Sequence, residues 1–406
     1  MFKLEPAGEP AALSVWRAAL AGLCATLVGG GLARFAYGPL IPALIEAGWF
    51  SPAQAGYLAA INLVGYVFGA AFARRLGERL EIRTMLRGLM LAAAASLLLC
   101  GFPPATVPGG FWWFALLRLA AGVSAGGIMI LSAPAVLAAA EPARRGLVSG
   151  IIFTGVGLGI AVSAALIPIV LELGLPSAWW ALAGASLLLT GLAWNGWPAH
   201  TPVPAPIRPR RTVPVALDRR VVVLVVSYGL NAFALVPHMV FLVDYVARGL
   251  GRGLAAGGFY WVVFGAGAAV GPLVAGFVGG RVGFARTARL GLPLQAGLVL
   301  LPVLSPTPVA IAISALLVGA FAPGTIPMAL GRAMDLVGTA GQGRVWSWLT
   351  TGWALMQTVG AYAMSYLYGH GADYAVLFET GSAALLLAFA IEFAGTRRTA
   401  SARPQT

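Results

Sequence analysis

The stretch that decides the fold is Val28-Gly-Gly-Gly-Leu-Ala-Arg34-Phe-Ala-Tyr37-Gly-Pro-Leu-Ile-Pro42, inside the first long apolar segment. An arginine at the centre of a membrane-spanning helix costs about 2.5–3.5 kcal/mol, so such a residue usually faces a water-filled cavity or a partner. The glycines allow another backbone or a ligand to come close, and the prolines loosen the helix. We therefore expect Arg34 to face a central cavity from a membrane helix.

The composition is that of an integral membrane protein. Hydrophobic residues make up 59% of the 406 residues and charged residues 10%, whereas soluble domains have about 25% charged residues. The net charge of +13 comes from short basic clusters between apolar segments, so we expect a lipid bilayer and no nucleic acid as the partner. The two cysteines, Cys24 and Cys100, lie in apolar segments, which excludes a disulfide framework and a thiolate metal site.

Twelve segments are long and apolar enough to cross a membrane, which takes about 20 residues. In the first half they are Trp16–Leu44, Ala53–Ala73, Thr84–Phe102, Phe111–Ala139, Gly146–Leu171 and Ala178–Trp197. After a polar linker, His200–Asp218, come Val221–Val246, Gly257–Gly280, Ala288–Leu304, Val309–Leu330, Arg344–Tyr368 and Tyr374–Phe393. This order predicts an all-α protein with two six-helix bundles, 16–198 and 221–394, joined by a linker at 199–220 and flanked by terminal segments 1–15 and 395–406.

The basic residues predict the orientation of these helices. All but four of the 26 lysines and arginines fall on the side that carries both termini; the exceptions are Arg34, Arg118, Arg248 and Arg252. Because cytoplasmic loops are enriched in lysine and arginine, we expect both termini in the cytoplasm and the protein in a bacterial inner membrane.

The two halves repeat a glycine pattern. Gly65-x-x-x-Gly69 precedes Arg75-Leu-Gly77, and Gly267-x-x-x-Gly271 precedes Arg281-Val-Gly283; an offset of 206 residues overlays Gly65 on Gly271 and Arg75 on Arg281. Two related six-helix units typically enclose a binding site near the middle of the membrane, at their interface.

These features resemble the major facilitator superfamily, whose motif after the second and eighth helices reads Gly-x-x-x-Asp-Arg-x-Gly-Arg. The second copy here is Gly276-Phe-Val-Gly-Gly280-Arg281-Val-Gly283-Phe, and the first is Ala70-Ala-Phe-Ala-Arg74-Arg75-Leu-Gly77-Glu; both lack the acidic residue. The stretch Gly31–Pro42 and Gly155-Val-Gly-Leu-Gly159 look most like the YbfB-type bacterial branch. The resemblance implies a twelve-helix transporter fold, alternating access, and a cytoplasmic gate at Arg75, Gly77, Arg281 and Gly283.

Arg34 and Arg118 are the two cations expected inside the membrane. Their distances from the predicted helix ends allow them to share one level, and the resemblance places the first and fourth helices along the cavity. Two guanidinium groups could then bind a carboxylate or a similar anion through paired N–H groups. The alternative is that either arginine bonds helix-end carbonyls or extends to the membrane surface.

Further candidates lie at helical depth. His238 follows Pro237 in the seventh helix, and its ordinary pKa near 6.5 suits proton exchange; Glu379 in the last helix is the alternative proton carrier. His238 is also a candidate substrate-binding residue, together with Tyr37, Asn231 and Gln357, although such polar groups more often join helices.

The glycines at Gly155, Gly157 and Gly159 follow no strand, so we interpret them as helix-packing residues and not as a dinucleotide site. The sequence has no Walker, His-Glu-x-x-His or Gly-x-Ser-x-Gly motif, and we expect no enzyme activity, cofactor or metal. The sequence predicts a monomeric secondary transporter for a small solute with proton coupling, and our hypothesis for the solute is an organic anion. Efflux of hydrophobic compounds is the alternative, and a non-transporting membrane sensor is a more distant one.

Overall fold

The first membrane helix consists of three consecutive parts. In the computed structural model, which describes residues 10–77, 80–137, 141, 145–198 and 218–400, these parts are α1 (Pro10–Thr26), the π-helix η1 (Leu27–Phe35) and α2 (Tyr37–Glu46). The amide of Ala36 donates to the Gly31 carbonyl, five residues back, at 2.9 Å. Such π-helical turns are rare and frequently lie at functional sites. Arg34 is therefore placed by a widened helical turn.

The remaining elements in the described ranges are also helical. In the first half they are α3 (Pro52–Gly77), α4 (Ile82–Leu99), the short η2 (Pro104–Thr106), α5 (Phe111–Leu137), α6 (Arg145–Leu171) and α7 (Leu175–Ala193). In the second half they are α8 (Arg219–Ala234), η4 (Pro237–Phe241), α9 (Leu242–Asp244), η5 (Tyr245–Gly249), α10 (Gly253–Val282), α11 (Phe284–Leu304), α12 (Pro308–Gly369) and α13 (Tyr374–Ala400).

The seventh helix repeats the irregularity of the first. Its parts α8, η4, α9 and η5 alternate between α- and π-helical hydrogen bonding. Pro237 opens η4; proline lacks an amide hydrogen and breaks the ordinary i to i−4 ladder. The first helix of each half therefore carries π-helical turns along its length.

Eleven helices in the described ranges are long and apolar enough to cross a membrane. The predicted segment Arg344–Tyr368 forms the second part of α12, beyond a non-helical residue, Gly338 (φ 65°). It falls outside the eleven spans because it is interspersed with Gln357, glycines, serines and threonines.

Two predicted boundaries differ from the structure. Helix α1 already begins at Pro10, since proline is favoured in the first turn of a helix. Helix α13 continues to Ala400, so residues 395–400 of the predicted tail are helical; Arg397 and Arg398 are good helix formers. The predicted linker, 199–220, lies outside the described residues up to position 217.

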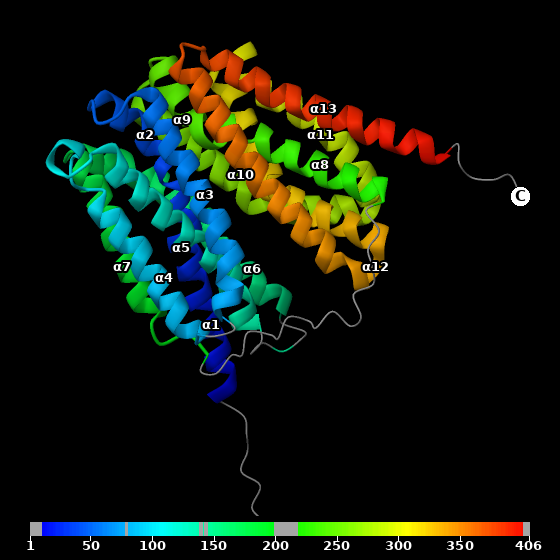
Figure 1. Ribbon diagram of the computed structural model, residues 1–406, viewed down its shortest axis with the longest axis horizontal. Coiled ribbons are helices and arrows are strands. Elements are labelled where there is room, and N and C mark those ends of the chain that lie inside the picture. Colours follow the sequence, from blue (N-terminus) through cyan, green and yellow to red (C-terminus); the bar gives the residue numbers. More distant parts are fainter. Residues whose placement is uncertain (1–9, 78–79, 138–140, 142–144, 199–217, 401–406) are drawn as a thin grey trace, which may run out of the picture.

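The helices form two groups that lie side by side along the long axis of the molecule, α1–α7 in blue to green and α8–α13 in green to red (Figure 1). Glycines bring helices into backbone contact in the same way in both groups. A Cβ atom on Gly65 or Gly69 would collide with the backbone of α5, and one on Gly267 or Gly271 with that of α12. Small residues at such contacts are typical of membrane helices, whose association depends on close packing.

Contacts between the two groups gather at one end, which we call the distal end. It carries the turns at 47–51, 100–110, 172–174, 250–252, 305–307 and 370–373, away from the beginning of α1 (Figure 1). There α2 packs on α9, Gly56 lies against Ser365, and the rings of Tyr57 and Tyr362 stack with centroids 5.9 Å apart. The largest buried apolar cluster also crosses this boundary.

Candidate functional site

A cavity lies between the two groups of helices, at the level of η1. Its empty volume is about 430 Å³, part of which is open to solvent. It is lined by Arg34, Phe35, Tyr37, Gly38, Ile41, Ala59, Asn62, Leu63, Arg118, Val236, Met239, Val240 and Gln357. We call it the interbundle cavity. It contains both predicted intramembrane arginines.

Arg34 spans the cavity from one half to the other. Its Nη2 donates to Oε1 of Gln357, on α12, at 2.6 Å. The guanidinium carbon lies 4.8 Å from the ring centre of Phe35 and 4.7 Å from that of Tyr66. Aromatic faces attract such a cation by about 0.5–2 kcal/mol, but they do not neutralise it.

Arg118 is more deeply enclosed, with 1% of its surface exposed. Its Nη1 donates to the carbonyl of Ala33 at 2.9 Å, and its guanidinium lies 4.3 Å from the ring centre of Tyr37. Nε of Arg118 has no hydrogen-bond partner in the described parts of the chain. Arg118 therefore bonds a carbonyl in the middle of the first membrane helix and lines the cavity.

Two neighbouring side chains hold this arrangement in place. The Tyr37 hydroxyl donates to the Ala55 carbonyl at 3.0 Å, which fixes the ring beneath Arg118. Nδ2 of Asn62 donates to the Arg118 carbonyl at 3.0 Å. The predicted residue Gln357 is in turn oriented by Met239, whose sulfur accepts from its Nε2 at 2.8 Å.

The cavity carries positive charge without an acidic counterpart. Within the described residues, ion pairs join Glu81 to Arg83, Asp244 to Arg248, and Glu392 to Arg332. None involves Arg34 or Arg118. Because an unpaired buried charge is costly, these two guanidinium groups are the main electrostatic feature of the cavity.

The comparison with known families identifies the class of protein. Residues 26–393 match a family described as "Uncharacterised MFS-type transporter YbfB". The chain belongs to this family. It is a multi-pass membrane protein and a secondary transporter of the major facilitator superfamily, not an enzyme, as its sequence predicts.

Two solved structures support the fold of this transporter. Both are of a bacterial homologue of the human lysosomal transporter Spinster, in inward-facing conformations. For the occupied form the TM-score is 0.72 at 14% identity, with 93% of this chain and 96% of the other covered. For the unoccupied form the TM-score is 0.74 at 14% identity, with 98% and 99% covered. No curated protein is similar enough to match. The predicted major facilitator fold is thus confirmed.

The other predicted binding residues of the transporter, and the predicted proton carrier Glu379, lie outside the interbundle cavity. His238 is fully buried; its Nε2 is 2.7 Å from the Ser314 hydroxyl and its ring packs edge-on against Phe378. Asn231 donates to Gln295 at 2.6 Å and lines a second cavity. Glu379 is exposed on the surface of α13. The structure therefore brings together Arg34, Tyr37, Arg118 and Gln357, but not these three.

The predicted gate residues are only partly described. Gly77 ends α3, and the side chain of Arg75 lies outside the described residues. Arg281 is exposed, with its guanidinium 3.9 Å from the ring centre of Phe277. Gly283 joins α10 to α11 with φ 96°, a conformation that favours glycine.

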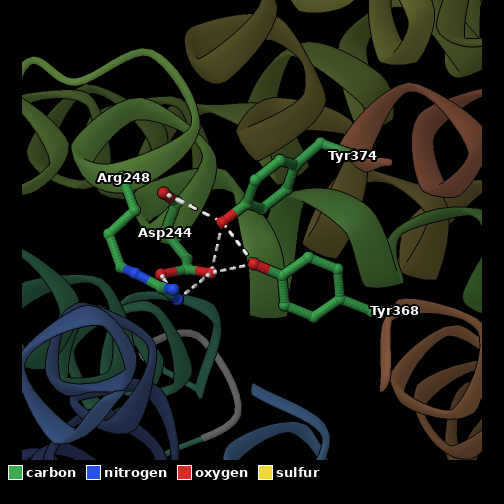
Figure 2. A network of polar contacts seen from close by, with 4 residues as sticks. All are labelled: Asp244, Arg248, Tyr368 and Tyr374. Carbon is green, nitrogen blue, oxygen red and sulfur yellow. Dashed lines mark hydrogen bonds and ion pairs between the residues drawn. The ribbon is translucent and has the colours of Figure 1, made fainter. Parts of the chain in front are cut away.

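Two buried acids went unrecognised in the sequence. Asp244 accepts hydrogen bonds from the hydroxyls of Tyr368 and Tyr374, at 3.2 and 2.6 Å, and pairs with Arg248 at 3.2 Å (Figure 2). Glu392 forms a two-bond ion pair with Arg332, at 2.6 and 2.7 Å. Arg332 follows the predicted segment Val309–Leu330, so the sequence indicates a charged residue in a loop. In the structure α12 continues past this position, and Arg332 is buried.

Proposed function

We propose that the transporter moves a small organic anion through the interbundle cavity by alternating access. The single observation that carries the proposal is the pair of cavity guanidinium groups, Arg34 and Arg118, which have no acidic partner among the described residues. Arginine binds a carboxylate through two parallel N–H groups, which gives both strength and orientation.

The opposite wall of the cavity limits the kind of anion. From the second half, Val236, Met239 and Val240 line the cavity and are apolar, beside the neutral Gln357. A second carboxylate on this side would lose its hydration without gaining a cationic partner. A monocarboxylate with a compact apolar body therefore fits the lining better than a dicarboxylate does.

The contacts between the halves support alternating access. At the distal end α3 and α12 touch through Tyr57 and Tyr362. Gly56 lies against Ser365 and Gly369 against Ala53 at the same end. This arrangement is that of a transporter closed at its distal end. With both termini in the cytoplasm, as the charge distribution predicts, the distal end is periplasmic and the state is inward-facing.

The experiment that tests the proposal uses purified protein in proteoliposomes. Counterflow of labelled benzoate and other monocarboxylates is measured for wild type and for Arg34→Gln, Arg34→Lys and Arg118→Gln. We expect at least a tenfold loss of flux in each cavity variant. Arg286→Gln, which removes an exposed arginine of α11, is the matched control and keeps wild-type flux. Undiminished flux in Arg34→Gln would contradict the proposal.

Efflux of hydrophobic compounds is the second candidate, and the apolar wall at Val236, Met239 and Val240 favours it. The two guanidinium groups would repel lipophilic cations, so this alternative concerns neutral compounds. Transport of a neutral hydrophobic dye that is unchanged in Arg34→Gln, together with no carboxylate counterflow in wild type, would select it.

We further propose that a proton gradient drives transport of the anion. His238 supports it better than Glu379 does, because it lies in η4, two residues from the cavity residue Val240, and its Nδ1 has no described hydrogen-bond partner. In the same liposomes, a pH gradient should drive uptake in wild type. His238→Asn should abolish the gradient-driven part and leave counterflow in place.

A further inference from the structure

A second cavity lies inside the C-terminal half, between α8, α11 and α12. Its empty volume is about 430 Å³, part of it open to solvent. Its lining is Leu224, Ser227, Tyr228, Asn231, Ala288, Gly291, Leu292, Gln295, Phe321, Thr325, Met328, Ala329 and Arg332. It shares no residue with the interbundle cavity. We call it the C-half cavity.

Two buried amide groups in this cavity are incompletely bonded. Asn231 and Gln295 are 2% and 1% exposed, and Nδ2 of Asn231 donates to Oε1 of Gln295 at 2.6 Å. Oδ1 of Asn231 and Nε2 of Gln295 have no hydrogen-bond partner in the described parts of the chain. If both amide groups are rotated by 180°, Gln295 becomes the donor and Asn231 the acceptor, but one N–H donor and one carbonyl acceptor are again left without a partner. A buried polar atom without a partner costs about 1–3 kcal/mol.

The C-half cavity is also electrically neutral, unlike the interbundle cavity. The charge of Arg332 is matched by Glu392 through two hydrogen bonds of 2.6 and 2.7 Å. The Ser227 hydroxyl donates to the same carboxylate at 2.6 Å. Neither charge of this pair is therefore available to an ionic ligand without breaking a buried ion pair.

We infer that the C-half cavity is a second binding site, which takes an uncharged group presenting a donor beside an acceptor, such as a primary carboxamide, on a small apolar body. The amide N–H of such a ligand bonds Asn231 and its carbonyl accepts from Gln295. Leu292, Phe321 and Met328, which also line the cavity, surround the apolar body. A carboxylate of the same shape lacks the donor and brings an unpaired charge next to Glu392. This inference stands on the C-half cavity alone and does not depend on the proposed anion site.

Benzamide and benzoate form a matched pair of probes, since they share shape but differ in charge and in the donor. Binding of each to full-length protein in lipid nanodiscs is measured by isothermal titration calorimetry. We expect benzamide to bind wild type and to lose at least tenfold affinity in Gln295→Met and in Asn231→Leu. Gln54→Met makes the same change at the distal start of α3, outside both cavities, and should leave benzamide affinity unchanged.

The thermal midpoint of each variant shows whether it is folded, and Asn231→Ala replaces Asn231→Leu if the larger side chain prevents folding. Benzamide affinity that persists in Arg34→Gln but falls in Gln295→Met supports the second site. Failure of both benzamide and nicotinamide to bind wild type overturns the inference, as does equal benzamide affinity in wild type and Gln295→Met. If wild type binds benzamide but not benzoate, the result contradicts the proposed anion site and supports the C-half cavity as a carboxamide site.

Discussion

Four arginines, Arg34, Arg118, Arg248 and Arg332, differ in how their positive charge is balanced. Arg248 pairs with Asp244 and Arg332 pairs with Glu392, whereas Arg34 and Arg118 bond only neutral groups among the described residues. Ionisable residues within membrane helices usually pair with one another or with backbone carbonyls. The structure therefore separates arginines with an acidic partner from arginines without one among the described residues, a difference that the sequence does not show.

The Arg332–Glu392 pair predicts a double-mutant result. Arg332→Leu alone and Glu392→Leu alone each leave one buried charge, and we expect each to lower the free energy of unfolding by about 3–5 kcal/mol. The double variant leaves none and should recover most of the loss. Thermal unfolding in detergent measures the effect. Equal destabilisation in the single and double variants would show that the pair is not coupled.

At the residue scale the sequence indicated the arginines and not their partners. Arg34 and Arg118 stand out because charges are rare in apolar segments, and Gln357 because it is polar at helical depth. The partners of these side chains are fixed by the packing of separate helices. The carbonyl of Ala33 and the ring of Tyr66 carry no signal in the sequence that links them to Arg118 or Arg34.

At the scale of the helix, η1 depends on the contact between Gly31 and Gly159. The two Cα atoms face each other so closely that a Cβ on either glycine would collide with the other's backbone. Gly155 lies in the same way against the backbone of α1. The glycine pattern predicted close packing, but not the π-helical turns, because apolar periodicity does not distinguish a π-turn from an α-turn within one segment.

This contact predicts that Gly31→Ala is destabilising. The added methyl group has no room, and overpacking costs about 1–3 kcal/mol. Gly88→Ala is the matched control, because a Cβ there meets open space, and alanine has the higher helix propensity. We expect a lower thermal midpoint for Gly31→Ala and an equal or higher one for Gly88→Ala. Equal midpoints for Gly31→Ala and wild type would mean that η1 can move away from α6.

The whole molecule consists of two groups of helices that touch at the distal end and enclose the interbundle cavity. The repeated glycine motifs predicted that the two halves are related repeats. The first copy contacts the backbone of α5, and the second copy contacts that of α12 in the same way. The sequence did not indicate which ends of the halves touch, since either gate of a transporter can be closed without any change in its residues.

The distal contact predicts that a cross-link there stops transport. Tyr57→Cys and Tyr362→Cys together, joined through two disulfides by a short bis-methanethiosulfonate reagent, would hold α3 and α12 in the stacked position of the two rings. Counterflow should fall to the level of empty liposomes and return after reduction. Each single cysteine variant, treated with the same reagent, should stay active. Full flux in the cross-linked double variant would show that the distal end need not open.

The burial of both native cysteines has a practical consequence. Cys24 and Cys100 are each 1% exposed, so the wild-type chain offers little thiol to an aqueous reagent. A new cysteine at an exposed position, such as Glu46 at the distal end or Arg286 at the other, is then the only accessible one in the described parts of the chain. The natural sequence is thus already a suitable background for fluorophores, spin labels and membrane-impermeant maleimides, which report on orientation and on domain movement without prior removal of its thiols.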